Sequence, residues 1–394
     1  MKIMSINAGS SSLKFSLFNM DTKEVLLSGL FERIGIEGSC YTLEYGEYKI
    51  KNEALMETHL DAVKILMDKL LELKIVNSLE EIDGIGHRIV HGGAIYKESV
   101  VVTDKVLDDI IALSDLAPLH NPAHAMCIKA FREVLPDTPM VVVFDTAFHQ
   151  TIEKDRFLYP VPYNWYTDYQ VRKYGAHGTS HRYVAKKLQE ELGRDDLNII
   201  SCHLGNGGSI TAISCGKCVD TSMGFTPHAG IMMGTRSGDI DVSIVPYVME
   251  KEGKSAGEIM NDLNKKSGFL GISGVSSDSR DIEDGIKEGN ERCILAQKMF
   301  VNSVIKYIAQ YYVLLGHVDV IAFTAGIGEN SVPIRREICE RLACLGVKID
   351  LDMNNKKSEE VKISTNDSSI AIYTIPTDEE LMVAKDTLEL ITNR

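Results

Sequence analysis

The sequence predicts a duplicated α/β fold in which each half follows the order β-β-β-α-β-α-β-α. Two observations carry this prediction. The same order of strand and helix patterns occurs twice along the 394 residues. A turn of Gly and small polar residues also separates the first and second strands of each half, in "INAGSSSLKF" (6–15) and "CHLGNGGSIT" (202–211). The chain is long enough for two domains that each bury a core.

The first half begins with three short strands joined by Gly, Ser, Asn and Asp turns. Apolar residues then recur every three or four positions, which predicts a helix, and continuous apolar runs predict buried strands. The expected elements are strands at 1–9, 13–20 and 24–35, a helix at 57–74, a strand at 82–90, helices at 104–113 and 121–135, and a strand at 139–145. Asn121 is the predicted N-cap of its helix, and Pro122 its first helical residue.

The second half repeats this order. The expected elements are strands at 197–205, 209–214 and 217–223, further helices, a strand at 318–326, a helix near 331–345, a strand at 369–376 and a helix at 378–391. Segment 354–362 is expected to be an exposed loop. Two such halves would face each other across a cleft, and ligands favour such interfaces.

Composition excludes several function classes. The net charge of −14 argues against a nucleic-acid partner. The N-terminus lacks the apolar core of a signal peptide, and no apolar run is long enough to span a bilayer, so we expect no membrane partner. Eight scattered Cys indicate reduced thiols in the cytoplasm. Cys215 and Cys218 form a C-x-x-C without a second pair, which favours two ordinary strand thiols over a zinc or redox site.

Gly-rich turns bring backbone N–H groups close to phosphate oxygens. The turns after the first strand of each half are neither a Walker A motif nor a dinucleotide fingerprint, because both lie between two strands. Lys14, just past the first turn, either meets a phosphate or is simply solvated. A third Gly-rich turn, "TAGIGENS" (324–331), follows a buried strand and precedes a helix, the usual position of a nucleotide-contacting loop.

Charged residues stand where buried strands or loops end. Arg88 interrupts an apolar strand, Asp145 ends another, and Arg236 lies in the loop "GTRSGD". Each could form a structural ion pair. Together with the Gly-rich turns they indicate a site that handles anions.

The stretch "HGTSH" contains His177 and His181, four residues apart. A helix is expected from residue 181, with Thr179 or Ser180 as N-cap, so the two rings would not share the helix face that a metal pair requires. A hydrolase elbow would need G-x-S-x-G, which is absent. His177 can instead donate a hydrogen bond to an anion ahead of a helix N-terminus, and His181 is expected to be a structural residue of the first turn.

Motifs from residue 3 to residue 380 resemble the acetate kinase family. They are "INAGSSSLKFSLF", "GHRIVHGG", "APLHNP", "FDTAFH", "YGAHGTSH", "HLGNGGSI", "DTSMGFTP", "MGTRSGDID", "TAGIGENS" and "PTDEE". The resemblance implies an actin-like, ribonuclease H-like ATPase fold and ATP-dependent phosphorylation of acetate. It further implies a homodimer and a need for Mg²⁺, for which Mn²⁺ could substitute. The implied domains are 1–148 plus 380–394 for acyl group and phosphate, and 149–379 for the nucleotide.

The resemblance also assigns roles to residues. The implied catalytic residues are Asp145, His177, Arg236, Arg88 and His120, with Arg88 binding the acyl carboxylate. Asn7 and Glu379 would help to hold the metal. The residues implied around the acyl methyl group are Val90, Leu119, Ala176 and Pro227. The residues implied to contact ATP are Ser10, Ser12, Lys14, His203, Leu204, Gly205, Asn206, Gly207, Asp278, Ser279, Arg280, Gly326, Ile327, Gly328, Glu329 and Asn330.

The chain departs from the family pattern near the acyl group. Ala176 stands where the pattern often has Phe, and Val242 stands where Pro is expected. Ala176 would leave room for propionate, because one methylene in an apolar pocket changes binding by only about 1–3 kcal/mol. The alternatives are therefore a propionate or butyrate kinase, a sugar kinase of the same superfamily, or a protein that ATP switches without a small acceptor.

Overall fold

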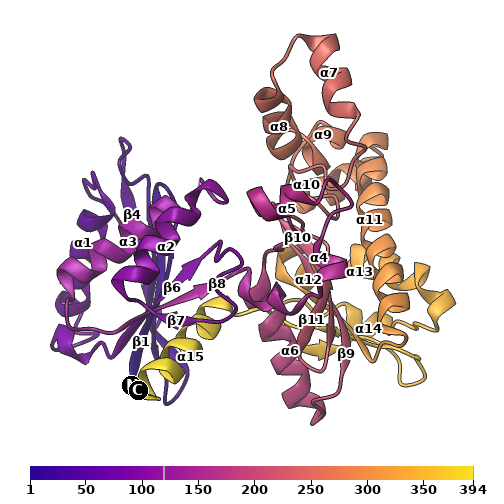
Figure 1. Ribbon diagram of the computed structural model, residues 1–394. Helices are drawn as coiled ribbons and strands as arrows, with labels where there is room; N and C mark the ends of the chain where they lie inside the picture. The colour runs from indigo at the N-terminus through magenta and orange to yellow at the C-terminus, as the bar shows by residue number, and fades with distance from the viewer. Residues whose placement is uncertain (119, 394) are drawn as a thin grey trace. The chain divides into compact units, whose positions relative to one another are not determined.

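The structure is a computed structural model that describes residues 1–118 and 120–393. The chain divides into two compact units (Figure 1). Unit 1 comprises Met1–Phe148 and Asp378–Arg394, and unit 2 comprises His149–Thr377. Each unit consists of a mixed sheet covered by helices.

The sheet of unit 1 has the strand order β5-β4-β3-β2-β1-β6-β8-β7. Its strands are β1 (Lys2–Ala8), β2 (Ser12–Asn19), β3 (Glu24–Glu32), β4 (Cys40–Tyr45), β5 (Tyr48–Glu53), β6 (Gly84–Ile89), β7 (Val100–Val101) and β8 (Met140–Phe144). β1 is antiparallel to β2 and parallel to β6, and β6 is parallel to β8. The helices are α1 (His59–Glu72), α2 (Asp104–Ala112), α3 (Asn121–Val134) and α15 (Glu379–Thr392).

The central strands of unit 1 are buried on both faces. In β1, Met4 and Ile6 join the core shared with α1 and α3, whereas Ile3 packs with Ala384 of α15. α15, drawn in yellow in Figure 1, packs against β1, β6 and β8. Its close approach depends on Gly86, because a Cβ there would lie 2.3 Å from Oγ1 of Thr387. The last helix of the chain thus completes the first unit.

The sheet of unit 2 has the strand order β11-β10-β9-β12-β14-β13. Its strands are β9 (Asn198–Leu204), β10 (Gly208–Ser214), β11 (Lys217–Thr221), β12 (Val320–Thr324), β13 (Val361–Lys362) and β14 (Ala371–Thr374). Its helices are α4 (Lys154–Phe157), α5 (Asn164–Tyr169), α6 (Gly178–Leu192), α7 (Ile244–Glu252), α8 (Ala256–Lys265), α9 (Gly268–Ser273), α10 (Ser279–Lys287), α11 (Glu291–Leu315), α12 (Ala325–Asn330), α13 (Val332–Arg341) and α14 (Leu351–Asn354).

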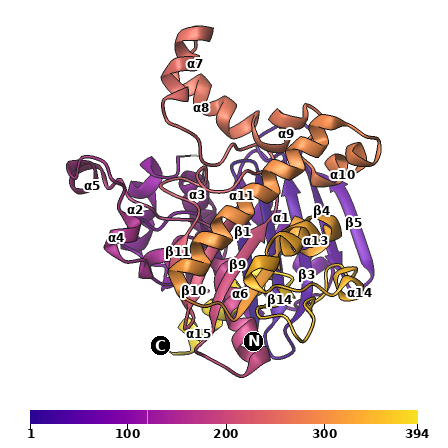
Figure 2. The ribbon, with the colours of Figure 1, turned by 90° about the vertical axis from the view of Figure 1, so that its right-hand side faces the viewer.

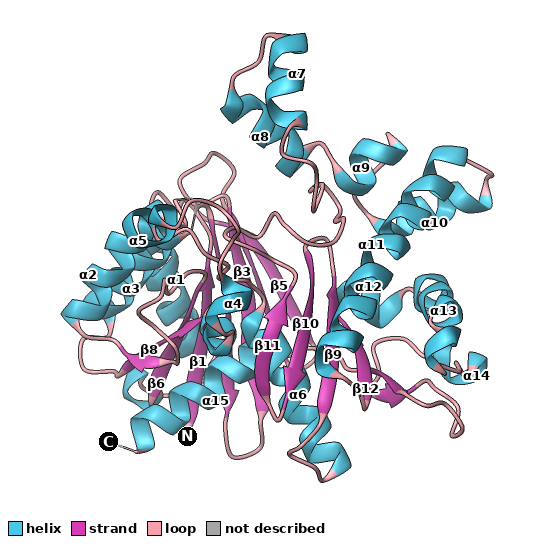
Figure 3. Ribbon diagram, turned by 45° about the vertical axis from the view of Figure 1, so that its right-hand side comes forward, coloured by secondary structure: helices cyan, strands magenta, loops and turns pink. Residues whose placement is uncertain are grey.

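Helices α11 and α6 lie on the sheet of unit 2. The long helix α11 contacts β9 and β10 and runs across the sheet in Figure 2. It packs on Ile200, Cys202 and Leu204 of β9, whereas α6 contacts the same strand from the face that carries Ser201 and His203. In Figure 3, α7 and α8 stand away from this sheet.

The two units share one topology, which confirms the predicted fold class. The order β3-β2-β1-β6-β8 in unit 1 corresponds to β11-β10-β9-β12-β14 in unit 2. In both, the first strand is antiparallel to the second and parallel to the next strand along the sheet. The prediction missed β4, although its Tyr41 and Leu43 alternate into the core. It also missed β5, because none of the described residues of β5 is buried and its charged side chains hide the strand pattern.

The start of α3 differs from the prediction. The helix begins at Asn121, and His120 occupies the N-cap position without a side-chain cap bond. Nδ2 of Asn121 donates to the carbonyl oxygens of His91 at 3.0 Å and Ile110 at 3.3 Å. Asn121, the predicted N-cap, is therefore the first residue of the helix, and its side chain forms tertiary contacts instead of a cap.

The described helices contain none with the length and apolar character needed to cross a bilayer. The described residues also include all eight cysteines, and each of them is a free thiol.

Candidate active site

Arg88, Asp145 and Glu379 form a charged group in unit 1. Arg88 lies in β6 and Asp145 directly follows β8, so two parallel neighbours bring these side chains to one end of the sheet. Nε of Arg88 donates to Oδ1 of Asp145 at 3.0 Å, and Nη2 donates to Oδ2 at 2.7 Å. Two-point contact of this kind fixes the guanidinium plane. Oε2 of Glu379, the first residue of α15, lies 3.9 Å from Nε of Arg88.

Burial and neighbouring charges shift the pKa values of this group. Asp145 is buried, and its charge raises the pKa of Arg88 above its usual value. Burial raises the pKa of Glu379, and the charge of Asp145 adds to that rise while Arg88 opposes it. One guanidinium thus faces two carboxylates. Asn7, a predicted metal ligand, lies in β1 and pairs across the sheet with Lys14 of β2.

The first predicted Gly/Ser turn is confirmed as the hairpin between β1 and β2. The N–H of Gly9 donates to the carbonyl oxygen of Ser12 at 2.8 Å, and Nε2 of His59 contacts the carbonyl oxygen of Gly9 at 2.8 Å. Ser10 is exposed, and Ser12 begins β2. Lys14 forms an ion pair with Glu380.

His120 and Val90 lie at the ends of α3 and β6 in unit 1. The ring of His120 is 6.4 Å from that of His124. Burial, together with the charges of Arg88 and His120, lowers the pKa of His124 to about 3. The N–H of Val90 lies 3.5 Å from Nδ1 of His124. Leu119, predicted beside the acyl group, lies outside the described residues.

A group of histidines lies where α6 meets β9 in unit 2. The rings of His177 and His203 are stacked, with centroids 4.1 Å apart. His177 has a φ of 58° and is itself the N-cap residue of α6, which begins at Gly178. The prediction that Thr179 or Ser180 caps this helix is therefore wrong, and Oγ of Ser180 instead contacts Nδ1 of His203 at 2.8 Å.

Arg236 and the β9–β10 turn lie beside His177. Nη1 of Arg236 donates to the carbonyl oxygen of Pro227 at 2.8 Å, and burial lowers the pKa of this guanidinium. A Cβ added at Gly207 would lie 3.5 Å from Nη1 of Arg236 and 3.7 Å from Cε1 of His177. The fold thus gathers the predicted turn, the predicted His and the predicted Arg into one place in unit 2.

Ala176 adds an apolar surface next to this group. It is buried in a cluster with Met223 and Met233. Sδ of Met233 lies 3.6 Å from Nη1 of Arg236. Ala176 and Pro227, the predicted acyl-group residues in unit 2, both lie close to Arg236. The sequence interpretation missed Met223 and Met233.

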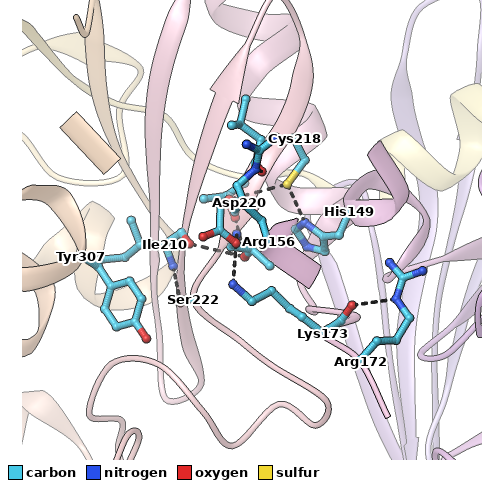
Figure 4. Close-up of polar contacts among 12 residues, drawn as sticks. His149, Arg156, Arg172, Lys173, Ile210, Cys218, Asp220, Ser222 and Tyr307 are labelled. Carbon is cyan, nitrogen blue, oxygen red and sulfur yellow. Dashed lines mark hydrogen bonds and ion pairs between the residues drawn. The ribbon is translucent and has the colours of Figure 1, made fainter. Parts of the chain in front are cut away.

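Buried polar contacts hold the segment before His177, as Figure 4 shows. Nζ of Lys173 lies 2.5 Å from Oδ1 of Asp220 in β11, and Nε2 of His149 lies 2.8 Å from the carbonyl oxygen of Ala176. Nδ1 of His149 contacts Sγ of Cys218 at 3.2 Å. The second thiol of the C-x-x-C therefore supports the loop that carries Ala176 and His177.

A cavity of about 720 Å³ in unit 2 brings half of the predicted nucleotide residues together. Its walls include the predicted residues Gly205, Asn206, Asp278, Ser279, Arg280, Gly326, Ile327 and Asn330. Asp278 accepts from the N–H of Arg280 at 2.9 Å as N-cap of α10, and the hydrogen bond from the Arg280 side chain lowers its pKa to about 2. Residues 325–330, predicted as a turn, form the short helix α12 directly after β12.

The same cavity contains residues that the sequence interpretation missed, namely Ser277, Glu283, Ser331 and Lys357. Ser331 and Glu283 are hydrogen-bonded to each other. Lys357 belongs to the segment that was expected to be a simple exposed loop. Of the remaining predicted nucleotide residues, His203 and Leu204 end β9, Gly207 closes its turn, and Gly328 and Glu329 belong to α12.

Arg335 of α13 ties α12 to that segment. Its side chain is completely buried, and burial lowers its pKa to about 10. Nη1 donates to the carbonyl oxygens of Gly328 and Glu329 at 2.9 and 2.7 Å. Nη2 donates to the carbonyl oxygens of Asn354 and Lys356 at 2.6 and 3.0 Å. One buried guanidinium therefore joins two walls of the cavity.

Comparison with known proteins gives full-length matches. A profile of the acetokinase family matches residues 2–385. The acetate kinase of Aster yellows witches'-broom phytoplasma (strain AYWB) is 52% identical over 394 residues, which is 100% of this chain and 96% of that protein. The crystal structure of Porphyromonas gingivalis acetate kinase superposes with a TM-score of 0.96 at 43% identity, covering 99% of both chains. A propionate kinase from Francisella tularensis superposes with a TM-score of 0.93, also at 43% identity and 99% coverage of both chains.

Proposed function

Because the chain belongs to the acetokinase family, we propose that it transfers the γ-phosphoryl group of ATP to the carboxylate of acetate, forming acetyl phosphate and ADP reversibly. The full-length likeness to acetate kinases carries this proposal. The cavity of about 720 Å³, which half of the predicted nucleotide residues line, supports it.

Transfer to a carboxylate needs no general base. A carboxylic acid with a pKa of roughly 4 to 5 is already ionised at neutral pH and can attack the γ-phosphorus directly. The barrier is then electrostatic, because two anions must meet while charge spreads over the transferring phosphoryl oxygens. Positively charged groups and hydrogen-bond donors lower such a barrier most when they are fixed in advance.

Each predicted catalytic residue has a part in this reaction. Arg88 would bind the acyl carboxylate, since Asp145 holds its Nε and Nη2 in a fixed plane. His177 and Arg236 would donate to the phosphoryl oxygens in the transition state, and His120 would lie near the path of transfer.

We infer that Mg²⁺, or Mn²⁺ in its place, accompanies the nucleotide. Asn7 and Glu379 would hold the ion, and Asp145 would orient its water ligands. Two carboxylates facing one guanidinium suit a cation, as does the raised pKa of Glu379, which a cation would oppose. Mg²⁺ in kinases is typically bound by one or two carboxylates together with substrate phosphates, whose charge it neutralises.

The length of the acid that the enzyme accepts is expected to depend on Ala176. Ala176→Phe should lower kcat/KM for propionate more than for acetate. The phenyl ring would fill space beside Met223 and Met233 that the extra methylene of propionate needs. The ratio of the two kcat/KM values should change by about 10-fold or more, within the range that one methylene supports. An unchanged ratio would show that Ala176 does not set the length of the acid that is accepted. Short-chain acids other than acetate remain the second candidate substrates.

The function is tested by measuring ADP formation with acetate, propionate, butyrate, glycerol or no acceptor. Hydroxylamine in the same reaction traps any acyl phosphate as a hydroxamate. We expect ADP release that depends on acetate and is matched by acetyl hydroxamate. Release that only glycerol stimulates would identify a kinase of hydroxyl groups, and release that no acceptor changes would identify an ATP-switched protein.

We infer that the protein is a homodimer and that α7 and α8 contribute to the interface. None of the described residues of α7 is buried, and the side chains of Val242, Tyr247 and Met260 are 80%, 62% and 40% exposed. Exposed apolar side chains grouped in this way mark interaction surfaces. Light scattering should give twice the chain mass of 43.7 kDa.

Tyr247→Glu should move the dimer toward the chain mass, whereas Tyr48→Glu in β5, where Tyr48 is 68% exposed, should not. A wild-type mass equal to that of one chain at micromolar concentration would contradict the dimer.

We infer a cytoplasmic location and, besides the second copy of the chain in the dimer, only small-molecule partners. ATP is a substrate of the proposed reaction. The free thiols agree with a reducing compartment. The net charge of −14 disfavours a nucleic-acid partner.

A further inference from the structure

A continuous chain of hydrogen-bonded side chains ends at His177. Oγ of Ser201 lies 2.9 Å from Nδ1 of His181, and Nε2 of His181 lies 2.8 Å from Oγ of Ser209. Oγ of Ser209 in turn lies 2.9 Å from Nδ1 of His177. The chain therefore runs through two hydroxyls and one imidazole before it reaches His177, the proposed hydrogen-bond donor to the phosphoryl oxygens.

Secondary structure places these residues together. Ser201 and Ser209 lie on β9 and β10, which are antiparallel neighbours, and His181 lies in the first turn of α6. Ser201, Ser209 and His181 are each 0% exposed. Side chains in such a place keep fixed partners, because an unsatisfied buried hydroxyl or imidazole costs roughly 1–3 kcal/mol.

The direction of the hydrogen bonds follows from Ser201. In the described part of the chain, the Ser201 hydroxyl contacts the His181 ring and has no second hydrogen-bond partner. The proton of the Ser201 hydroxyl can form a hydrogen bond here only if it is donated to Nδ1 of His181. His181 then carries its proton on Nε2 and donates to Ser209, so the Ser209 hydroxyl donates to Nδ1 of His177.

His181 is suited to this role because it stays neutral. Burial lowers its pKa well below the usual value, and the charges of His149 and His203 lower it further. A neutral imidazole has one donor and one acceptor nitrogen. The hydrogen bond from the Ser201 hydroxyl makes Nδ1 of His181 the acceptor and Nε2 the donor.

We propose that Ser209, oriented by His181 and Ser201, fixes His177 in the tautomer that carries its proton on Nε2. Its importance for catalysis rests on the proposed function, in which His177 donates to the phosphoryl group; the tautomer itself does not. Ser201, His181 and Ser209 are then positioning residues. They give His177 a donor nitrogen without requiring the ring to be protonated.

The proposal is tested on full-length protein labelled with ¹⁵N-histidine, with the His177 signals identified by their loss in His177→Gln. Wild-type His177 should show a protonated Nε2 and an unprotonated Nδ1. In Ser209→Ala the Nδ1–H form should appear, because the hydroxyl that donates to Nδ1 is gone. Thr211→Val is the matched control, since Thr211 lies two residues away in β10, is also 0% exposed, and pairs its hydroxyl with Thr221 at 2.8 Å.

Activity gives a second reading. Ser209→Ala should lower kcat about 10-fold, with KM for ATP within about twofold of wild type, as expected when a transition-state donor is only partly lost. Thr211→Val should leave kcat within about twofold. Ser201→Ala, at the far end of the chain, should shift the His177 tautomer in the same direction and serves if Ser209→Ala does not fold.

A wild-type His177 with its proton on Nδ1, or a Ser209→Ala protein with an unchanged tautomer, would overturn the proposal. The ¹⁵N result does not depend on turnover. If the tautomer is as expected but no acyl phosphate forms, the proposed function fails and the hydrogen-bond chain stands.

Discussion

Replacing Arg236 with Lys should lower kcat about 100- to 1000-fold, the loss typical of removing one fixed donor to a developing anion. Lys keeps the charge but lacks the planar fork of donors. In Arg236 one nitrogen is held by the carbonyl oxygen of Pro227 at 2.8 Å, so the remaining donors have a set direction. Since the contact acts mainly in the transition state, kcat and kcat/KM should fall together.

Arg292→Lys is the matched control for this change. Its Nε also donates to a carbonyl oxygen, that of Ile272 at 2.7 Å, but Arg292 is exposed in α11, whereas Arg236 lies beside Gly207 and His177. We expect its steady-state kinetics to stay within about twofold of wild type, as surface substitutions usually have small effects. An Arg236→Lys enzyme that retains at least half of the wild-type kcat would contradict the role assigned to Arg236.

Replacing Arg335 with Met should give the largest loss of stability, about 3–5 kcal/mol, because each buried carbonyl oxygen left without a donor costs roughly 1–3 kcal/mol and the site relaxes only in part. The change leaves the carbonyl oxygens of Gly328, Glu329, Asn354 and Lys356 without their donor. Urea unfolding of unit 2 should report the loss. Binding of ATP should weaken as well, because α12 and the Lys357 segment both line the cavity.

The neighbouring Arg336→Met separates this effect from the general cost of losing an arginine. Arg336 is exposed and pairs with Glu340 at 2.7 Å, four residues along the same helix. Exposed pairs of this kind contribute about 0.3–0.5 kcal/mol. Equal midpoints for the two variants would show that Arg335 does not hold the two cavity walls together.

The fold could be predicted because its signals are local. Each buried strand of the shared topology has its own apolar run, and the turns between the first two strands of each unit contain Gly and small polar residues. β5 escaped because a solvated strand at the edge of a sheet lacks that pattern. β4 does alternate, with Tyr41 and Leu43 buried, and the sequence interpretation missed that alternation. The caps at Asn121 and Ser180 were misassigned because both side chains bond to groups distant in sequence.

The candidate site was predictable only as far as its motifs extend. Gly205, Asp278 and Gly326 lie in recognisable turns, and the fold brings them to one cavity. Glu283 and Lys357 have no motif, since α10 and the segment after α14 reach the cavity only through tertiary packing. His181 was expected to be structural, and its links to Ser201 and Ser209 depend on how α6 packs against the β9–β10 hairpin, which no sequence motif indicates.

The central claim is that one chain transfers a phosphoryl group from ATP to a carboxylate in a single in-line step. It is tested most directly with ATP that is chiral at the γ-phosphorus, followed by analysis of the acetyl phosphate formed. In-line attack by the carboxylate inverts the configuration once, so the account predicts inversion. Retention would require an even number of transfers and would contradict direct transfer.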